Sequence, residues 1–245
     1  MPAPGLPTAA TLDLWQAAEG LAPVERSLVL AAAGGEDPAA LRGLPIGRRN
    51  ARLLALHAAL GGRLLEATAP CPSCGELAEF AVDPEALPRS DEPVEPVPVE
   101  ADGFVVSWRP PDSDDVAAAM SAGDAVAAER LLLSRCVTAA AGSDATVDGT
   151  ALPAPVRAAV DRAMAEADPL GEVLIDVACP TCGAAFVADL DVGDFVWAEV
   201  RARAWRLLQD VHVLARAYGW TEAEVLALGD RRRAAYLELV GQPEP

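Results

Sequence analysis

Four of the five cysteines of the chain lie in two similar five-residue segments, Cys71-Pro72-Ser73-Cys74-Gly75 and Cys179-Pro180-Thr181-Cys182-Gly183. A Cys-x-x-Cys turn directs two thiolates at one point, and the glycine that follows relieves the backbone there. Two thiolates fill only half of a tetrahedral zinc site, and neither segment has a histidine close by to complete it. We therefore predict one structural Zn²⁺ ion bound jointly by Cys71, Cys74, Cys179 and Cys182.

Strand-like sequence flanks both cysteine segments. Residues 63–69 and 77–82 surround the first, and residues 172–177 and 184–190 surround the second. The chain thus repeats one hairpin, and two such hairpins facing each other across a metal form a zinc ribbon. Because 104 residues separate Cys74 from Cys179, the rest of the fold must support this closure.

Two other interpretations of the cysteines are less favoured. A thioredoxin-like redox pair lies at the start of a helix in a βαβ unit, which neither segment does, and it does not explain the duplication. Disulfides are the second alternative. The N-terminus has no signal peptide, however, and a chain of this size can form a hydrophobic core without disulfide cross-links.

Length and composition indicate a folded protein of one or two domains. The chain has 245 residues, of which 52% are hydrophobic and 4% aromatic. The apolar residues are mostly Ala, Leu and Val, which favours helices packed through small side chains. No apolar run approaches the length of a membrane span, and no secretory or lipidation signal is visible, so we expect a cytoplasmic protein.

The charge balance argues against nucleic acid as a partner. The net charge is −18, and all 19 basic residues are arginines. A nucleic-acid surface is rich in positive charge, whereas this chain has only local arginine clusters.

These features predict an α+β fold that is mainly α-helical, with helical lobes around a central four-cysteine zinc ribbon made of two β-hairpin knuckles. The chain then divides into an N-terminal helical region, a discontinuous zinc ribbon, an acidic proline-rich linker, a strand with a helical insertion, and a C-terminal helical region. In that order, the regions span residues 1–62, 63–82 together with 172–192, 83–102, 103–171 and 193–245.

Periodicity places several elements within these regions. Apolar residues at helical spacing predict helices from about Gly47 to Ala59 and from Asp194 to Tyr218. Alternation over residues 103–109 predicts a strand. A later apolar helical segment runs as far as Val137, before a polar loop at Gly142–Thr150.

Three isolated side chains could do chemistry but are better explained by packing. We expect His57 to pack within its helix, because four thiolates already complete the metal site. His212 is expected in the core or at its rim. Cys136 lies in an apolar segment and is expected to be a buried thiol, not a nucleophile.

Three polar features have a structural interpretation, with partner binding as the alternative for each. The proline-rich and acidic segment 83–102 is interpreted as a solvated linker, and the Arg48, Arg49 and Arg52 cluster as a solvated face or as internal salt bridges. The Arg231–Arg233 run is expected to form local ion pairs with Glu222, Glu224 and Glu238. Prolines exclude a helix or a central strand from the first of them.

A set of short segments in the second half of the chain forms a recognisable pattern: Leu132–Val137, Asp168–Leu170, Cys179–Gly183, Phe195–Trp197, Asp210–Leu228 and Arg231–Leu237. With these residues the chain resembles the T-even-phage-type baseplate protein family, whose members are also encoded in bacterial contractile injection system clusters. The resemblance covers about residues 103–240, and the first cysteine segment fits more loosely. It implies a baseplate component or assembly factor with other baseplate or tail proteins as partners, and it supplies no catalytic residues.

The sequence contains no recognisable nucleophile–base constellation, glycine-rich phosphate loop or paired-carboxylate motif. A zinc ion held by four thiolates has no open position for water, which disfavours hydrolysis. We therefore expect a non-enzymatic structural or assembly protein of a phage-tail-like contractile injection system baseplate. The alternatives are a zinc-ribbon adaptor in nucleic-acid machinery and a thiol oxidoreductase.

Overall fold

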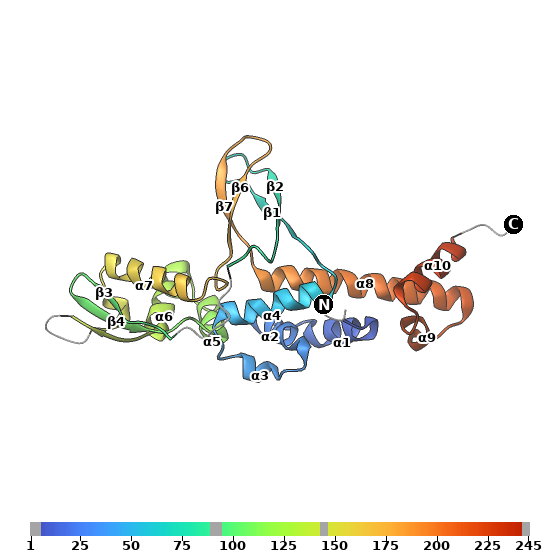
Figure 1. Ribbon diagram of the computed structural model, residues 1–245, viewed down its shortest axis with the longest axis horizontal. Coiled ribbons are helices and arrows are strands. Elements are labelled where there is room, and N and C mark those ends of the chain that lie inside the picture. Colours follow the sequence, from blue (N-terminus) through green and yellow to red (C-terminus); the bar gives the residue numbers. More distant parts are fainter. Residues whose placement is uncertain (1–5, 89–94, 143–146, 242–245) are drawn as a thin grey trace.

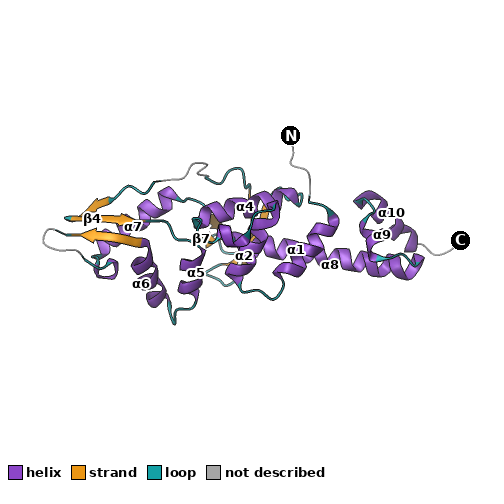
Figure 2. Ribbon diagram, turned by 90° about the horizontal axis from the view of Figure 1, so that it is seen from below, coloured by secondary structure: helices purple, strands orange, loops and turns teal. Residues whose placement is uncertain are grey.

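A computed structural model describes residues 6–88, 95–142 and 147–241 of the chain. Helices dominate these ranges and the strands form small antiparallel sheets, which confirms the predicted α+β, mainly helical class (Figures 1 and 2). The α-helices are α1 (Thr8–Ala18), α2 (Pro23–Ala31), α3 (Pro38–Leu41), α4 (Ile46–Ala59), α5 (Ser113–Met120), α6 (Ala125–Cys136), α7 (Ala154–Ala167), α8 (Val192–Tyr218), α9 (Glu222–Leu226) and α10 (Asp230–Val240). The strands are β1 (Leu65–Pro70), β2 (Leu77–Val82), β3 (Val99–Ala101), β4 (Phe104–Trp108), β5 (Val137–Ala141), β6 (Leu174–Ala178) and β7 (Ala185–Asp189). Two short 3₁₀ helices are η1 (Ala32–Gly34) and η2 (Gly149–Ala151).

The main hydrophobic core forms where α1, α2 and α4 pack along the 27-residue helix α8. Val192, Val196 and Val200 recur every four residues on one side of α8, and all three are buried. Leu28 of α2 and Leu53 of α4 belong to the same buried cluster. The helix thus carries its apolar residues at the spacing that faces one partner layer.

Local capping explains where α8 begins and ends. The Asp191 carboxylate accepts a hydrogen bond from the backbone N–H of Asp194, so the helix begins at Val192, two residues before the predicted start. It ends where Gly219 adopts a left-handed conformation with φ of 72°. The short helix α9 follows and begins with the capping box between Thr221 and Glu224.

A second hydrophobic cluster lies beneath a three-stranded sheet of order β3-β4-β5. Val106 and Trp108 from β4 pack there with Val156 and Val160 from α7. The prediction that helix continues to Val137 was wrong, because α6 ends at Cys136 and Val137 starts strand β5. Val137 pairs with Trp108 across the sheet, and this long-range pairing overrides the local helical spacing.

The acidic proline-rich segment 83–102 contributes strand β3 at its C-terminal end. This strand lies at the edge of its sheet, which the prolines permit. The backbone carbonyl of Val97 also accepts a 3.0 Å hydrogen bond from the Trp108 indole N–H. Residues 89–94 of the segment lie outside the described residues, as do residues 143–146 of the predicted polar loop.

A buried carboxylate ties the sheet to helices α5 and α6. Asp115 is fully buried and accepts hydrogen bonds from Arg109 at 2.5 Å and from Arg135 at 2.6 Å. The backbone N–H of Asp112 donates to the same carboxylate. Burial alone would raise the pKa of Asp115, but the hydrogen bonds from Arg109, the Asp112 backbone and Arg135 outweigh it and hold the pKa below the ordinary carboxyl value.

Candidate metal centre

Each pair of cysteines lies in the turn of a small antiparallel strand pair. Strands β1 and β2 flank the first turn, and β6 and β7 flank the second. In the first turn, the N–H of Cys71 donates to the carbonyl of Glu76 and the N–H of Gly75 donates to the carbonyl of Cys71, both at 2.8 Å. The second turn repeats these two bonds from Cys179 to Ala184 and from Gly183 to Cys179, both at 2.9 Å. The sequence repeat therefore reflects a repeated backbone geometry.

The glycine after each pair is required by that geometry. Gly75 has a φ of 78° and Gly183 a φ of 75°. These values lie in the left-handed region that side chains with a Cβ rarely adopt. Because the glycine turns the chain back sharply, both cysteines of a pair lie on the same side of their turn.

The two turns meet, and their four sulfurs form one cluster. The Sγ atoms of Cys71, Cys74, Cys179 and Cys182 all lie within 4.8 Å of one another. Across the two turns, Cys71 Sγ is 3.7 Å from Cys182 Sγ, and Cys74 Sγ is 3.7 Å from Cys179 Sγ. All four thiols are free of disulfides. The structure thus brings together the four predicted ligand residues.

The sulfur separations fit a tetrahedral zinc ion. With zinc–sulfur bonds of about 2.3 Å, the sulfurs of a tetrahedral site lie about 3.8 Å apart. The two cross-turn distances of 3.7 Å match this value, whereas a disulfide bond would require about 2 Å. Sulfur ligands select zinc or another soft metal over magnesium or calcium. The cluster can therefore hold one metal ion with every coordination position filled by protein.

Backbone N–H groups prepare two of the thiols to ionise. The N–H groups of Cys74 and Ser73 donate to the Cys71 sulfur and lower the pKa of Cys71 to about 6. The N–H of Cys182 acts in the same way on Cys179 and lowers its pKa. Cys74 differs, because burial and its sulfur neighbours outweigh the lowering effect of the Glu76 N–H and raise its pKa to about 12. Without a cation, repulsion prevents four neighbouring sulfurs from all carrying negative charge. A divalent metal ion would offset this repulsion and allow the thiols to ionise.

Packing between the strand pairs supports the cluster from below. Ala78 of β2, Val177 of β6 and Ala188 of β7 form a small buried cluster of their own. Leu65 and Val82, at the base of the first pair, belong instead to the main helical core. Figure 1 shows both pairs standing side by side on one side of the helical layer, near the start of α8 and far from α9 and α10. The metal centre therefore lies at the tip of a projection whose base is fixed in the core.

The two histidines take no part in the sulfur cluster. His57 is buried, as expected for a packing residue, and its Nδ1 lies 2.6 Å from the Glu199 carboxylate. Its ring also meets Phe195 edge to face. His212 is exposed on α8 and so lies outside the core where it was expected.

Cys136 is buried, as predicted, but its surroundings are polar. Its sulfur lies 3.7 Å from the buried carboxylate of Asp115. Burial, together with that negative charge, raises the pKa of the Cys136 thiol to about 12. A thiol with such a pKa is protonated at neutral pH and is a poor nucleophile.

Each of the two arginine clusters forms ion pairs within the chain, as expected. Arg49 is buried and donates to Ser113 and Asn50, while Arg52 forms an ion pair with Glu36 at 2.8 Å. At the other end of the chain, Arg233 is buried and binds Asp210 and Asp230, not the glutamates expected as its partners.

Sequence reasoning missed two polar constellations. One is the buried Asp115 cluster, in which Asp115 both forms a capping box with Asp112 and binds Arg109 and Arg135. The other is a polar pocket beside α8 lined by Arg203, Arg206 and Asp210. The available signal for the pocket was that these charged residues recur on one side of α8 at three- and four-residue spacing.

No protein-family model matches the chain, and neither a curated protein nor a solved structure matches it. None of the helices in the described ranges combines the length and the apolar character that a membrane crossing needs.

Proposed function

We propose that this chain is a non-enzymatic structural or assembly protein of a phage-tail-like contractile injection system baseplate, held together by one structural zinc ion in a zinc ribbon. The observation that carries the structural role is the cluster of four cysteine sulfurs within 4.8 Å, drawn from two distant parts of the chain. A metal ion bound there would join the two strand pairs. Because all four positions would be filled by thiolates, the ion would stabilise structure and not activate water.

The baseplate assignment rests on the residues that resemble the T-even-phage-type family. Most of them, Asp210–Leu228 and Arg231–Leu237, form the last turns of α8 together with α9 and α10. There, Trp220 stacks on Tyr218 with ring centroids 4.8 Å apart, and Tyr236 meets Trp220 edge to face. This end of the molecule extends away from the strand pairs in Figure 1, which leaves it accessible to neighbouring proteins. Aromatic residues of this kind are frequent in protein interfaces.

Deletion of the gene, followed by electron microscopy of sheathed particles, tests the proposal. We expect particles without baseplates or with incomplete ones, and restoration by the wild-type gene. A chain with Cys74→Ser and Cys182→Ser should restore them less well, because the zinc ribbon would be open. Complete and firing-competent particles in the deletion strain would contradict the proposed role.

A further inference from the structure

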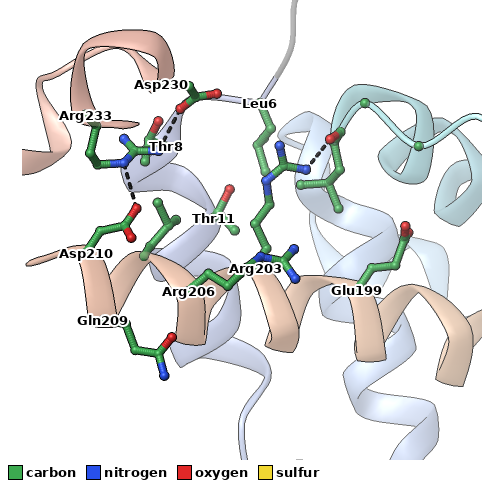
Figure 3. A pocket seen from close by; sticks show the side chains of 14 residues that line it. Leu6, Thr8, Thr11, Glu199, Arg203, Arg206, Gln209, Asp210, Asp230 and Arg233 are labelled. Atoms are coloured by element: carbon green, nitrogen blue, oxygen red, sulfur yellow. Dashed lines mark hydrogen bonds and ion pairs between the residues drawn. The ribbon is translucent and has the colours of Figure 1, made fainter. Parts of the chain in front are cut away.

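A polar pocket of about 530 Å³ lies between helices that do not follow one another directly in the sequence. Its walls come from the start of α1, the loop after α4, one side of α8 and the beginning of α10 (Figure 3). Thr8 and Thr11 of α1 face Arg203 and Arg206 of α8 across it. The pocket is therefore formed only when these four helices pack together.

One of the three arginines in this pocket is neutralised by its neighbours. Arg233 lies 3.0 Å from Asp210 and 2.7 Å from Asp230. Its charge is thus balanced by two carboxylates, and its side chain is buried. Arg233 fixes α10 onto α8 and is not available to a ligand.

The other two arginines have no carboxylate partner among the described residues. Arg203 donates to the backbone carbonyl of Leu60, which is a neutral acceptor. Arg206 has no hydrogen bond or ion pair in the described parts of the chain. The two residues are three positions apart on α8, so their positive charges lie on the same side of the helix.

The three acidic residues that line the pocket are all engaged with other side chains: Asp210 and Asp230 with Arg233, and Glu199 with His57. Glu199 lies one helical turn before Arg203, but its carboxylate is 2.6 Å from His57 Nδ1. Gly62 makes this arrangement possible, because a Cβ at that position would overlap the His57 ring. Gly62 thus packs directly on the His57 ring that engages Glu199, while Arg203 and Arg206 line the pocket.

We propose that this pocket binds an oxyanionic group, a carboxylate or a phosphate, between Arg203 and Arg206. Guanidinium groups present a planar fork of N–H donors that matches the oxygen pairs of both anions. The hydroxyls of Thr8 and Thr11 add donors from the facing wall. The volume exceeds that of a single ion, so the group can belong to a small phosphate compound or to an acidic segment of a protein. This inference does not depend on the proposed function.

Isothermal titration of the full-length protein with two probes tests the proposal. One probe is inorganic phosphate and the other is a short glutamate-containing peptide with blocked termini. Arg206→Ala is the test variant, because Arg206 is exposed and its removal breaks no described contact. Arg201→Ala is the matched control, since Arg201 is also an exposed arginine of α8 but does not line the pocket.

We expect at least one probe to bind the wild type, and Arg206→Ala to weaken that binding by about tenfold or more. Arg206→Glu should abolish it, while Arg201→Ala should change it by less than about twofold. Preference for phosphate would identify a small phosphate compound as the source, and preference for the peptide an acidic protein segment. The proposal is overturned if neither probe binds, or if Arg201→Ala and Arg206→Ala weaken binding equally.

Discussion

The sulfur of Cys71 lies 3.7 Å from the sulfur of Cys182, although 111 positions separate the two residues in the sequence. This contact closes the chain between the two strand pairs into one large loop, which contains the β3-β4-β5 sheet and helices α5, α6 and α7. A cross-link that closes a long loop lowers the entropy of the unfolded chain. A metal ion at this position would therefore stabilise the packing of the two strand pairs on each other.

The first prediction concerns metal content. The purified protein should contain about one zinc ion per chain by elemental analysis. Cys74→Ser and Cys182→Ser should each lower the metal affinity by more than about tenfold, because one thiolate is lost from a closed site. Cys136→Ala is the control, since Cys136 lies outside the sulfur cluster and this variant should keep its zinc. Full zinc binding by the Cys182→Ser chain would contradict a four-cysteine site.

The second prediction concerns which part of the protein loses structure when a chelator removes the metal. The strand pairs share only a small buried cluster, whereas α2, α4 and α8 share the main core. Removal of zinc should therefore increase amide hydrogen exchange in residues 65–82 and 174–189, with little change in the three helices. Mass spectrometry after exchange, with and without a chelator, measures this directly. Equal loss of protection throughout the chain would show that the metal supports the helical core as well.

The third prediction concerns the buried carboxylate of Asp115. Asp115→Asn leaves Arg135 without its carboxylate partner and Arg109 with only its longer 3.4 Å pair to Asp112, and should lower the free energy of unfolding by about 3 kcal/mol at neutral pH. Asp114→Asn is the control, because Asp114 is half exposed and its 2.9 Å pair with Arg42 lies at the surface. That variant should lose less than about 1 kcal/mol.

The effect of Asp115 should also depend on pH. Since the folded state holds the pKa of Asp115 below its ordinary value, the carboxylate stabilises the fold above the ordinary pKa and loses this effect as the pH falls through the lowered one. The difference in stability between wild type and Asp115→Asn should thus be largest near neutral pH and shrink in acid. Denaturant unfolding across this range measures it. A stability difference that grows as the pH falls would contradict this prediction.

The fourth prediction concerns Gly62, which covers the His57 ring. Gly62→Ala should cost about 1–3 kcal/mol, because its Cβ would overlap the ring and displace either His57 or the loop after α4. Gly123→Ala is the matched control, since a Cβ there meets no atom within 4 Å. Thermal unfolding of both variants compares them. Equal stability of the two would show that the loop adapts without strain.

Local sequence signals predicted several helices well, but they failed where long-range contacts determine the secondary structure. The start of α2 at Pro23, the capping box of Thr221 and the body of α8 follow from residue types within one or two turns. Strand β5 could not be predicted in this way, because Val137 and Ala140 are strand residues only through their pairing with β4. The short helix α3 was missed for a different reason: Asp37 caps it and Pro38 stands in its first turn, which is a helix start signal, but the proline and the neighbouring glycines were interpreted as a break.

The sequence by itself identified the four candidate ligand cysteines, because Cys-x-x-Cys followed by glycine defines a turn through residues that are adjacent in the chain. Only the tertiary structure decided that the two turns meet, that Asp115 lies beneath two arginines, and that Glu199 turns to His57 and leaves Arg203 and Arg206 facing a pocket. Except for Asp115 and Arg109, which are six positions apart, these relationships join residues from different helices or strand pairs. They depend on how helices and strands pack around α8, and the spacing of residues along the chain does not predict that packing.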